Sequence, residues 1–213
     1  MYLTLFQLTE PLPKEHAEAL LKKVSPDRRR IFLRQKGEEA AALRLLPAVY
    51  TRAYLAAALG RDNRELQFAV TREQKPYLLG NALFFNFAHT AGAFAFACDR
   101  SPVGVDLEKP RRMRRNLIER YYSEGEKAQI EAGADPVLIW TKKEALLKLR
   151  GEGLAGILSA DTASMQDVFF DSRKVGEYFL TMATKTPEKP EFEILTLEKL
   201  AKAALSLEDL EES

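Results

Sequence analysis

Residues 140–154 constrain the fold of this chain more than any other stretch. They read WTKKEALLKLRGEGL, in which Lys, Glu, Ala, Leu and Arg are good helix formers and two glycines would end a helix. The i, i+4, i+8 spacing places Trp140, Glu144 and Lys148 in one stripe along that helix. Taken alone, this stripe is typical of a surface helix with a tryptophan anchor and one Glu–Lys pair.

A second stretch, VGVDLE at residues 103–108, is typical of a short strand. The two-residue period of a strand places Asp106 and Glu108 on the same side. Two carboxylates in register repel each other, and a cation between them would remove that cost; oxygen ligands suit Mg²⁺. The alternative is a strand end with two exposed acids, and it stays open because a lone D-x-E pattern is frequent.

Composition excludes several classes of protein. The 213 residues fit one large domain or two small ones, with 46% hydrophobic and 30% charged residues. The net charge of +1 gives no overall attraction to nucleic acid or to an anionic membrane. No apolar run approaches the roughly 20 residues that span a bilayer, and the N-terminus lacks a basic leader. Cys98 is the only cysteine, so an internal disulfide is impossible and we expect a cytoplasmic location.

Periodicity and turn residues predict a chain of mixed helices and strands, the α+β fold class. The Phe–Ala alternation near residue 95 predicts a β-hairpin over 83–99 with its turn at 90–92. Pro47 would kink or divide the longest helix. We expect further strands over residues 2–8, 66–70, 103–108, 168–171, 177–183 and 191–195. We expect helices over residues 14–24, 25–36, 39–59, 114–122, 124–132, 136–150 and 196–211.

A basic, proline-containing linker at residues 109–115 marks a seam between two halves, residues 1–103 and 104–213. The second half loosely repeats the first in the order of its elements, although no repeat is visible at the level of residues. His89 stands at a strand end beside a glycine-containing turn, which suits either a ligand contact or a buried histidine bonded to the backbone. The run Arg28–Arg30 suits either a solvated basic face or a phosphate clamp.

Together, four motifs resemble the 4′-phosphopantetheinyl transferase family. VGVDLE followed by WTKKEALLK is similar to the signature (I/V)-G-(I/V)-D-x-E and (F/W)-(S/C/T)-x-K-E-(A/S)-x-x-K. FNFAHT at residues 85–90 looks like the F-N-x-S-H-S segment, and QKP at residues 74–76 is similar to G-K-P. The motifs occur in the family's order over residues 74–154. The length of the chain resembles the Sfp (surfactin-synthetase-activating) type, in which two similar α+β halves pack as a pseudo-dimer within one chain.

This resemblance implies a reaction. Coenzyme A would bind in the cleft between the halves, and a serine hydroxyl of an acyl or peptidyl carrier protein would attack its β-phosphate. The products would be holo-carrier protein and 3′,5′-ADP. Asp106, Glu108 and Glu144 would hold Mg²⁺, and the three carboxylates do not decide between Mg²⁺ and Mn²⁺. Glu144 would also act as the base for the serine, directly or through water.

The resemblance also assigns the binding of coenzyme A. Lys148, with help from Lys143, would neutralise the phosphates. Lys75 and His89 would contact the nucleotide end, with His89 near the 3′-phosphate. Thr90 keeps a hydroxyl where the family has its second Ser.

The chain departs from the family pattern at three places. Ala88 replaces a Ser and Gln74 replaces a Gly. The family's Arg followed by Ser-Leu-Leu-Gly is absent from helix 39–59. Either Arg44 or the run Arg28–Arg30 would then bind the phosphate.

Two alternatives to a transferase remain. One is a non-catalytic module of the same fold that binds coenzyme A or docks a carrier protein, although such a module has no need of the three carboxylates and two motif lysines. The other is a nucleic-acid binder, against which the near-zero net charge argues. We expect a monomer with no nucleic-acid or membrane partner. The sequence does not name the carrier protein: carriers of fatty-acid synthesis, of secondary-metabolite synthesis by polyketide or peptide synthetases, or of a lysine pathway are all compatible with it.

Overall fold

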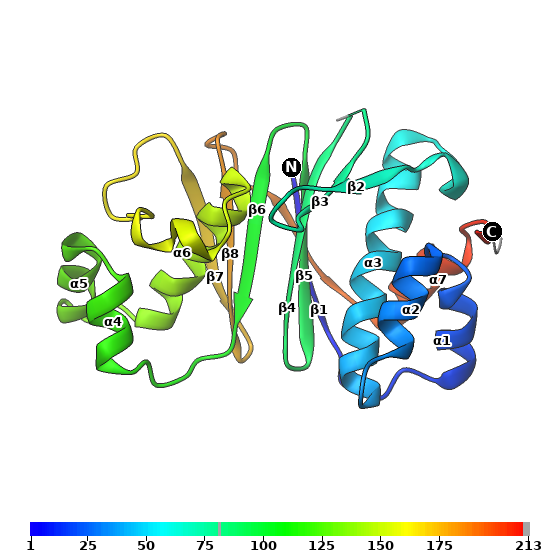
Figure 1. The fold of residues 1–213 in the computed structure, drawn as a ribbon, viewed down its shortest axis with the longest axis horizontal. Coiled ribbons are helices and arrows are strands. Elements are labelled where there is room, and N and C mark those ends of the chain that lie inside the picture. The colour runs from blue at the N-terminus through cyan, green and yellow to red at the C-terminus, as the bar shows by residue number, and fades with distance from the viewer. Residues whose placement is uncertain (81, 211–213) are drawn as a thin grey trace.

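The computed structural model describes residues 1–80 and 82–210. Among these residues, a four-stranded and a three-stranded β-sheet lie side by side, with helices on their outer sides (Figure 1), and a third sheet is a two-stranded hairpin. The α+β fold class predicted from the sequence is confirmed.

The larger sheet has the strand order β4-β5-β1-β9. β1 pairs antiparallel with β5 and parallel with β9, and the hairpin of β4 and β5 turns at Gly92, whose φ is +76°. The bounds of these strands are β1 Tyr2–Gln7, β4 Phe84–Thr90, β5 Ala93–Asp99 and β9 Glu191–Leu195.

The Phe–Ala alternation of β5 separates two faces of this sheet. Phe94 and Phe96 are buried in a core built with helix residues such as Leu46 and Val49. Ala93, Ala95 and Ala97 are buried in a second core, which they share with strands of the smaller sheet. The small alanine side chains allow the smaller sheet to pack closely against this face.

Four helices cover the phenylalanine face of the larger sheet (Figure 1). The longest, α3, runs through Pro47 as one helix, so of the two predicted effects, a kink or a division, the division does not occur. These helices are α1 Lys14–Leu21, α2 Pro26–Leu33, α3 Glu38–Leu59 and α7 Leu197–Leu205. A short 3-10 helix, η1 Asn63–Glu65, and a small hairpin of β2 Phe68–Val70 and β3 Pro76–Leu78 follow α3.

The smaller sheet has the order β6-β8-β7. One face of β6 contributes Val103, Val105 and Leu107 to the core shared with the larger sheet, so the alternate residues, Asp106 among them, face the helix packed on the other side. The bounds are β6 Val103–Glu108, β7 Phe169–Val175 and β8 Tyr178–Thr184, with helices α4 Arg115–Tyr121, α5 Glu124–Glu131, α6 Pro136–Arg150 and the 3-10 helix η2 Leu154–Leu158.

The chain returns to the first half at its end. β9 adds to the larger sheet beside β1, and α7 packs into the core around α3. The predicted half 104–213 thus contributes its last strand and helix to residues 1–103. The helix predicted over 196–211 ends at Leu205, and residue 211 lies outside the described residues.

Candidate functional site

Helix α6 lies directly on strand β6 at Gly104. A Cβ atom at this position would stand 2.0 Å from the carbonyl oxygen of Ala145 and 2.3 Å from the backbone nitrogen of Leu149. Only a residue without a side chain permits this approach of helix to strand. The approach places Glu144 and Lys148, which flank Ala145 and Leu149 on the helix, above Asp106.

We expect Gly104→Ala to lower the free energy of unfolding by roughly 3 kcal/mol, the upper end for overpacking, because the added methyl meets backbone atoms that cannot rotate away. Urea denaturation of the two proteins measures the difference. Gly133→Ala is a poor control because Gly133 has a positive φ; Gly153→Ala, where a Cβ meets only Glu73 side-chain atoms at 3.6 Å or more, is the matched one. Equal losses in both variants would contradict the close approach.

Asp106 is the buried carboxylate of the site. Its Oδ1 accepts a hydrogen bond of 2.6 Å from the Lys148 ammonium, while its buried Oδ2 has no hydrogen-bond partner among the described residues. Burial raises the pKa of Asp106, and the charge of Lys148 opposes this rise. A buried carboxylate oxygen without a partner is costly, so the site is suited to a further cationic ligand.

Glu144 is half-buried beside Asp106. Burial, followed by the negative charge of Asp106, raises the pKa of Glu144 to about 7, with Lys148 opposing and Glu108 adding to the rise. Glu108 itself bonds Arg111 at 2.5 Å. The three predicted carboxylates therefore lie close enough for their charges to interact.

Within the described residues, no group of three or more His, Cys, Asp or Glu side chains is arranged to hold a metal ion. The reason is local, since Asp106 bonds Lys148 and Glu108 bonds Arg111. The carboxylates of Asp106, Glu108 and Glu144 nevertheless fit a hard cation, because all their donor atoms are oxygens. One buried oxygen has no partner among the described residues, and the negative charges of the carboxylates repel each other.

Lys75 reaches this site from the loop before β3. Its ammonium donates to the backbone oxygen of Val103 at 3.1 Å and to that of Lys148. The preceding residue, Gln74, has a φ of +63°, a left-handed conformation that favours glycine. Gln74 therefore holds a backbone conformation that glycine, the first residue of the G-K-P segment it resembles, would adopt without strain.

The pKa of Lys75 predicts how stability depends on pH. Burial and then the charge of Lys148 lower this pKa from 10.5 to about 8. The unfolded chain, with its ordinary lysine pKa, binds more protons between these two values, so the free energy of unfolding rises with pH across that window. Urea denaturation of the wild type and of Lys75→Met should show the wild type gaining relative stability between about pH 8 and about pH 10. Parallel pH profiles for the two proteins would contradict this.

Arg44, His89 and Thr90 line one cavity of about 530 Å³ between the start of α3 and the β4–β5 turn. Burial, then the charge of Arg44, lowers the pKa of His89, and Lys148 adds to this effect. Lys36 also lines this cavity, and so do the carboxylates of Glu38 and Glu39, so cationic, neutral and anionic groups border it. Three of the residues predicted to bind coenzyme A thus lie together.

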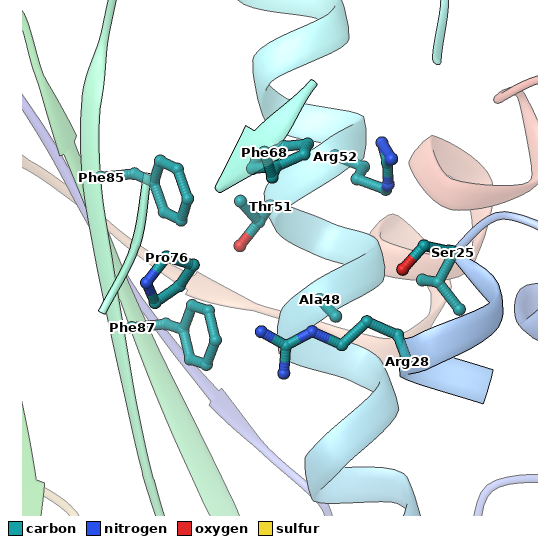
Figure 2. Close-up of a pocket in the computed structure, with 10 residues that line it drawn as sticks. Ser25, Arg28, Ala48, Thr51, Arg52, Phe68, Pro76, Phe85 and Phe87 are labelled. Atoms are coloured by element: carbon teal, nitrogen blue, oxygen red, sulfur yellow. The ribbon is translucent and has the colours of Figure 1, made fainter. Parts of the chain in front are cut away.

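A second cavity, of about 150 Å³, lies between α2, α3 and β4. Figure 2 shows Phe85, Phe87 and Pro76 along one side, with the Arg28 guanidinium extending from α2 toward Phe87. Of the run Arg28–Arg30, only Arg28 is among the residues that line it. Burial, then the charge of Arg44, lowers the pKa of Arg28. Sequence reasoning did not anticipate the aromatic wall, for which the alternating phenylalanines of β4 were the available signal.

Lys143 lies elsewhere. Only 1% of its side chain is exposed, and its ammonium bonds the fully buried Glu126 at 2.7 Å. It also donates to the backbone oxygen of Ala160. The structure therefore does not bring Lys143 to Asp106 and Glu144, because adjacent helix positions point about 100° apart and the Lys143 side chain lies in the buried contact with Glu126.

The carboxylates and Lys148 lie in a part of the chain that is similar to a known protein superfamily. Residues 102–205 match the model of the 4′-phosphopantetheinyl transferase superfamily. These residues belong to that superfamily. Within this transferase domain lie Asp106, Glu108, Glu144 and Lys148, whereas Lys75, His89 and Arg44 lie before it.

Curated relatives extend the similarity beyond the transferase domain. The 4′-phosphopantetheinyl transferase ffp of Bacillus subtilis is 28% identical over 156 residues, covering 70% of this chain and 69% of the relative. The 4′-phosphopantetheinyl transferase Sfp of Bacillus subtilis strain 168 is 26% identical over 156 residues, again covering 70% of this chain and 69% of the relative. The 4′-phosphopantetheinyl transferase AcpT of Salmonella typhi is 32% identical over 117 residues, covering 51% of this chain and 61% of the relative.

The resemblance to Sfp-type 4′-phosphopantetheinyl transferases and the predicted enzyme class are thereby confirmed. Across the described part of the chain, no helix has both the length and the apolar character required to cross a bilayer.

Proposed function

We propose that this protein transfers the 4′-phosphopantetheine group of coenzyme A to a serine of an acyl or peptidyl carrier protein, in a Mg²⁺-dependent reaction. The observation that carries the proposal is the buried Asp106–Lys148 pair, with one carboxylate oxygen unpartnered and Glu144 beside it. Such a site combines a cationic phosphate ligand with carboxylates suited to a hard cation. We expect it to act as a monomer, because both halves belong to one chain.

Asp106, Glu108 and Glu144 would hold the cation, and Mn²⁺ accepts the same oxygen ligands. When bound, the cation would supply charge neutralisation for the pyrophosphate of coenzyme A. It would also relieve the repulsion between the carboxylates and the cost of the unpartnered Asp106 oxygen.

Phosphoryl transfer needs an aligned nucleophile and neutralised charge more than covalent help from the protein. Glu144 would accept the proton of the carrier serine, directly or through water. Burial and the charge of Asp106 raise its pKa in the free protein, and a bound cation would lower that pKa and keep the carboxylate ionised. The serine oxygen would form a bond to the β-phosphorus while the bond to the 3′,5′-ADP oxygen breaks. Lys148, held by Asp106, would neutralise the charge that develops on the phosphate oxygens.

The two cavities suit the remaining parts of coenzyme A. Arg44 and His89 line the larger cavity and would bind the 3′-phosphate, where Thr90 offers a hydroxyl. The aromatic wall of Phe85 and Phe87 would receive the adenine ring in the smaller cavity. The two-residue period of β4 places Phe85, Phe87 and His89 on the same side of that strand, so one strand would serve both cavities.

Intact-mass spectrometry of an apo acyl carrier protein, incubated with this protein, coenzyme A and Mg²⁺, tests the proposal. We expect the carrier to gain one phosphopantetheine, and we expect Glu144→Gln to slow this gain by about 10²–10⁴-fold, the size of a lost general base. Lys202→Met, an exposed change on α7, should leave it unchanged.

Calorimetry with coenzyme A separates the alternatives. Binding without transfer to any of several carriers would favour a non-catalytic module of the same fold. If the protein neither bound coenzyme A nor transferred phosphopantetheine, the proposal would be contradicted outright.

A further inference from the structure

Among the described strands, no backbone ladder joins the larger sheet to the smaller one. β4 and β6 are edge strands of these two sheets, and β6 turns one edge of its backbone toward the first half. Successive residues of a strand point their backbone groups to opposite edges, so the oxygen of Val103 and the nitrogen of Val105 lie on the same edge. Both groups have partners, and both partners are side chains of the first half.

Asn86 on β4 satisfies one of these groups. Its Oδ1 accepts a hydrogen bond of 2.8 Å from the backbone nitrogen of Val105, and the Asn86 side chain is buried. Lys75 satisfies the other, donating to the Val103 oxygen at 3.1 Å. The two bonds flank Gly104, where α6 lies on β6.

Lys75 also caps helix α6. The last four carbonyl groups of a helix lack partners within it. In α6, the Leu147 oxygen accepts from the backbone nitrogens of Gly151 and Glu152, and the Lys148 oxygen accepts from the Lys75 ammonium. A cation at this end also interacts favourably with the helix dipole.

We propose that Lys75 and Asn86 are positioning residues that lock the first half to β6 and α6 and thereby fix the Lys148 side chain over Asp106. Lys75 holds the backbone of Lys148, whose side chain bonds Asp106 at 2.6 Å. Two of the three Lys75 donors are already committed to backbone oxygens, which argues against the role first expected for it, a contact with the nucleotide end of coenzyme A. Misplacement of a catalytic group by about 1 Å costs about 10²-fold in rate.

The effect on catalysis rests on the proposed function, but the lock itself can be tested without it. Hydrogen exchange of the free protein is compared for the wild type, Lys75→Met and Asn86→Leu, with Lys202→Met as the control. Lys75→Met keeps the length and apolar part of the side chain and removes only the ammonium group. We expect at least tenfold faster exchange of amides in residues 103–107 and 149–152 in both variants, and no change in the control.

Two further readouts separate positioning from ligand contact. If Lys75 positions Lys148, Lys75→Met lowers kcat about 10- to 100-fold while the Kd for coenzyme A, measured by calorimetry without metal, changes less than about threefold. Unchanged exchange, or a Kd weakened tenfold with kcat preserved, would overturn the proposal. Failure of the wild type to transfer phosphopantetheine would remove the proposed function, and the exchange result would still decide whether the lock exists.

Discussion

Replacing Asp106 by Asn is expected to lower kcat for phosphopantetheine transfer by about 10²–10³-fold, the size observed when one electrostatic stabiliser is removed from an active site. The substitution keeps the shape of the side chain and removes its charge. Lys148 then loses the carboxylate that holds its ammonium at 2.6 Å. The candidate cation site loses its most buried oxygen ligand at the same time.

The same substitution should leave the fold nearly as stable as before. Burial raises the pKa of Asp106, so the buried charge costs the native protein free energy that a neutral amide at this position would not cost. Lys148 is 29% exposed and can be hydrated when its partner is gone. We therefore expect the free energy of unfolding to change by less than about 1 kcal/mol.

Transfer measured by intact mass and stability measured by urea denaturation check the two expectations on the same preparations. Asp167→Asn is the matched control, because Asp167 also bonds a lysine, Lys185, but its side chain is 70% exposed. A rate for Asp106→Asn within about threefold of the wild type would remove Asp106 from the mechanism. A loss of several kcal/mol in the free energy of unfolding would instead show that Asp106 stabilises the fold.

Local patterns predicted much of the fold and site. The two-residue period of β6 places Asp106 toward α6, while Val103 and Val105 enter the core shared by the two sheets. The four-residue spacing on α6 brings Glu144 and Lys148 to the same side, and Gly151 ends the helix in a left-handed conformation. These features depend on a few neighbouring residues, so the sequence carries them directly.

Other features depend on contacts distant in sequence. The parallel pairing of β9 with β1 joins residues at opposite ends of the chain, such as Tyr2 and Glu191, and no local pattern specifies it. The arrangement of Arg44 beside His89 likewise follows from how α3 lies on the hairpin. Motif matching grouped Lys143 with Glu144, although neighbouring positions on a helix do not share a face.

Replacing Lys143 by Met is expected to lower the free energy of unfolding by about 3–5 kcal/mol, the cost of leaving one partner of a buried ion pair uncompensated. Glu126 is fully buried, and its Oε2 accepts from Lys143 at 2.7 Å and from the Ser123 nitrogen at 2.9 Å. Its Oε1 accepts from the nitrogen and hydroxyl of Thr162. This network ties α5 and the segment after η2 to α6.

The effect of Lys143→Met on stability and on coenzyme A binding distinguishes a structural role of Lys143 from a binding role. A ligand contact would weaken the affinity for coenzyme A without destabilising the protein, whereas the buried pair predicts lost stability from the lysine change alone. Lys142→Met, one position away and partly exposed, is the matched control and should fall within about 0.5 kcal/mol of the wild type.

A double variant completes the test. Adding Glu126→Gln to Lys143→Met removes the stranded charge, and replacing a whole buried pair is often close to neutral. The double variant should therefore be more stable than Lys143→Met alone in urea denaturation, giving a coupling free energy of at least about 1 kcal/mol. If the two substitutions merely add, the residues do not stabilise each other, and the role of Lys143 must lie in its bond to the Ala160 oxygen.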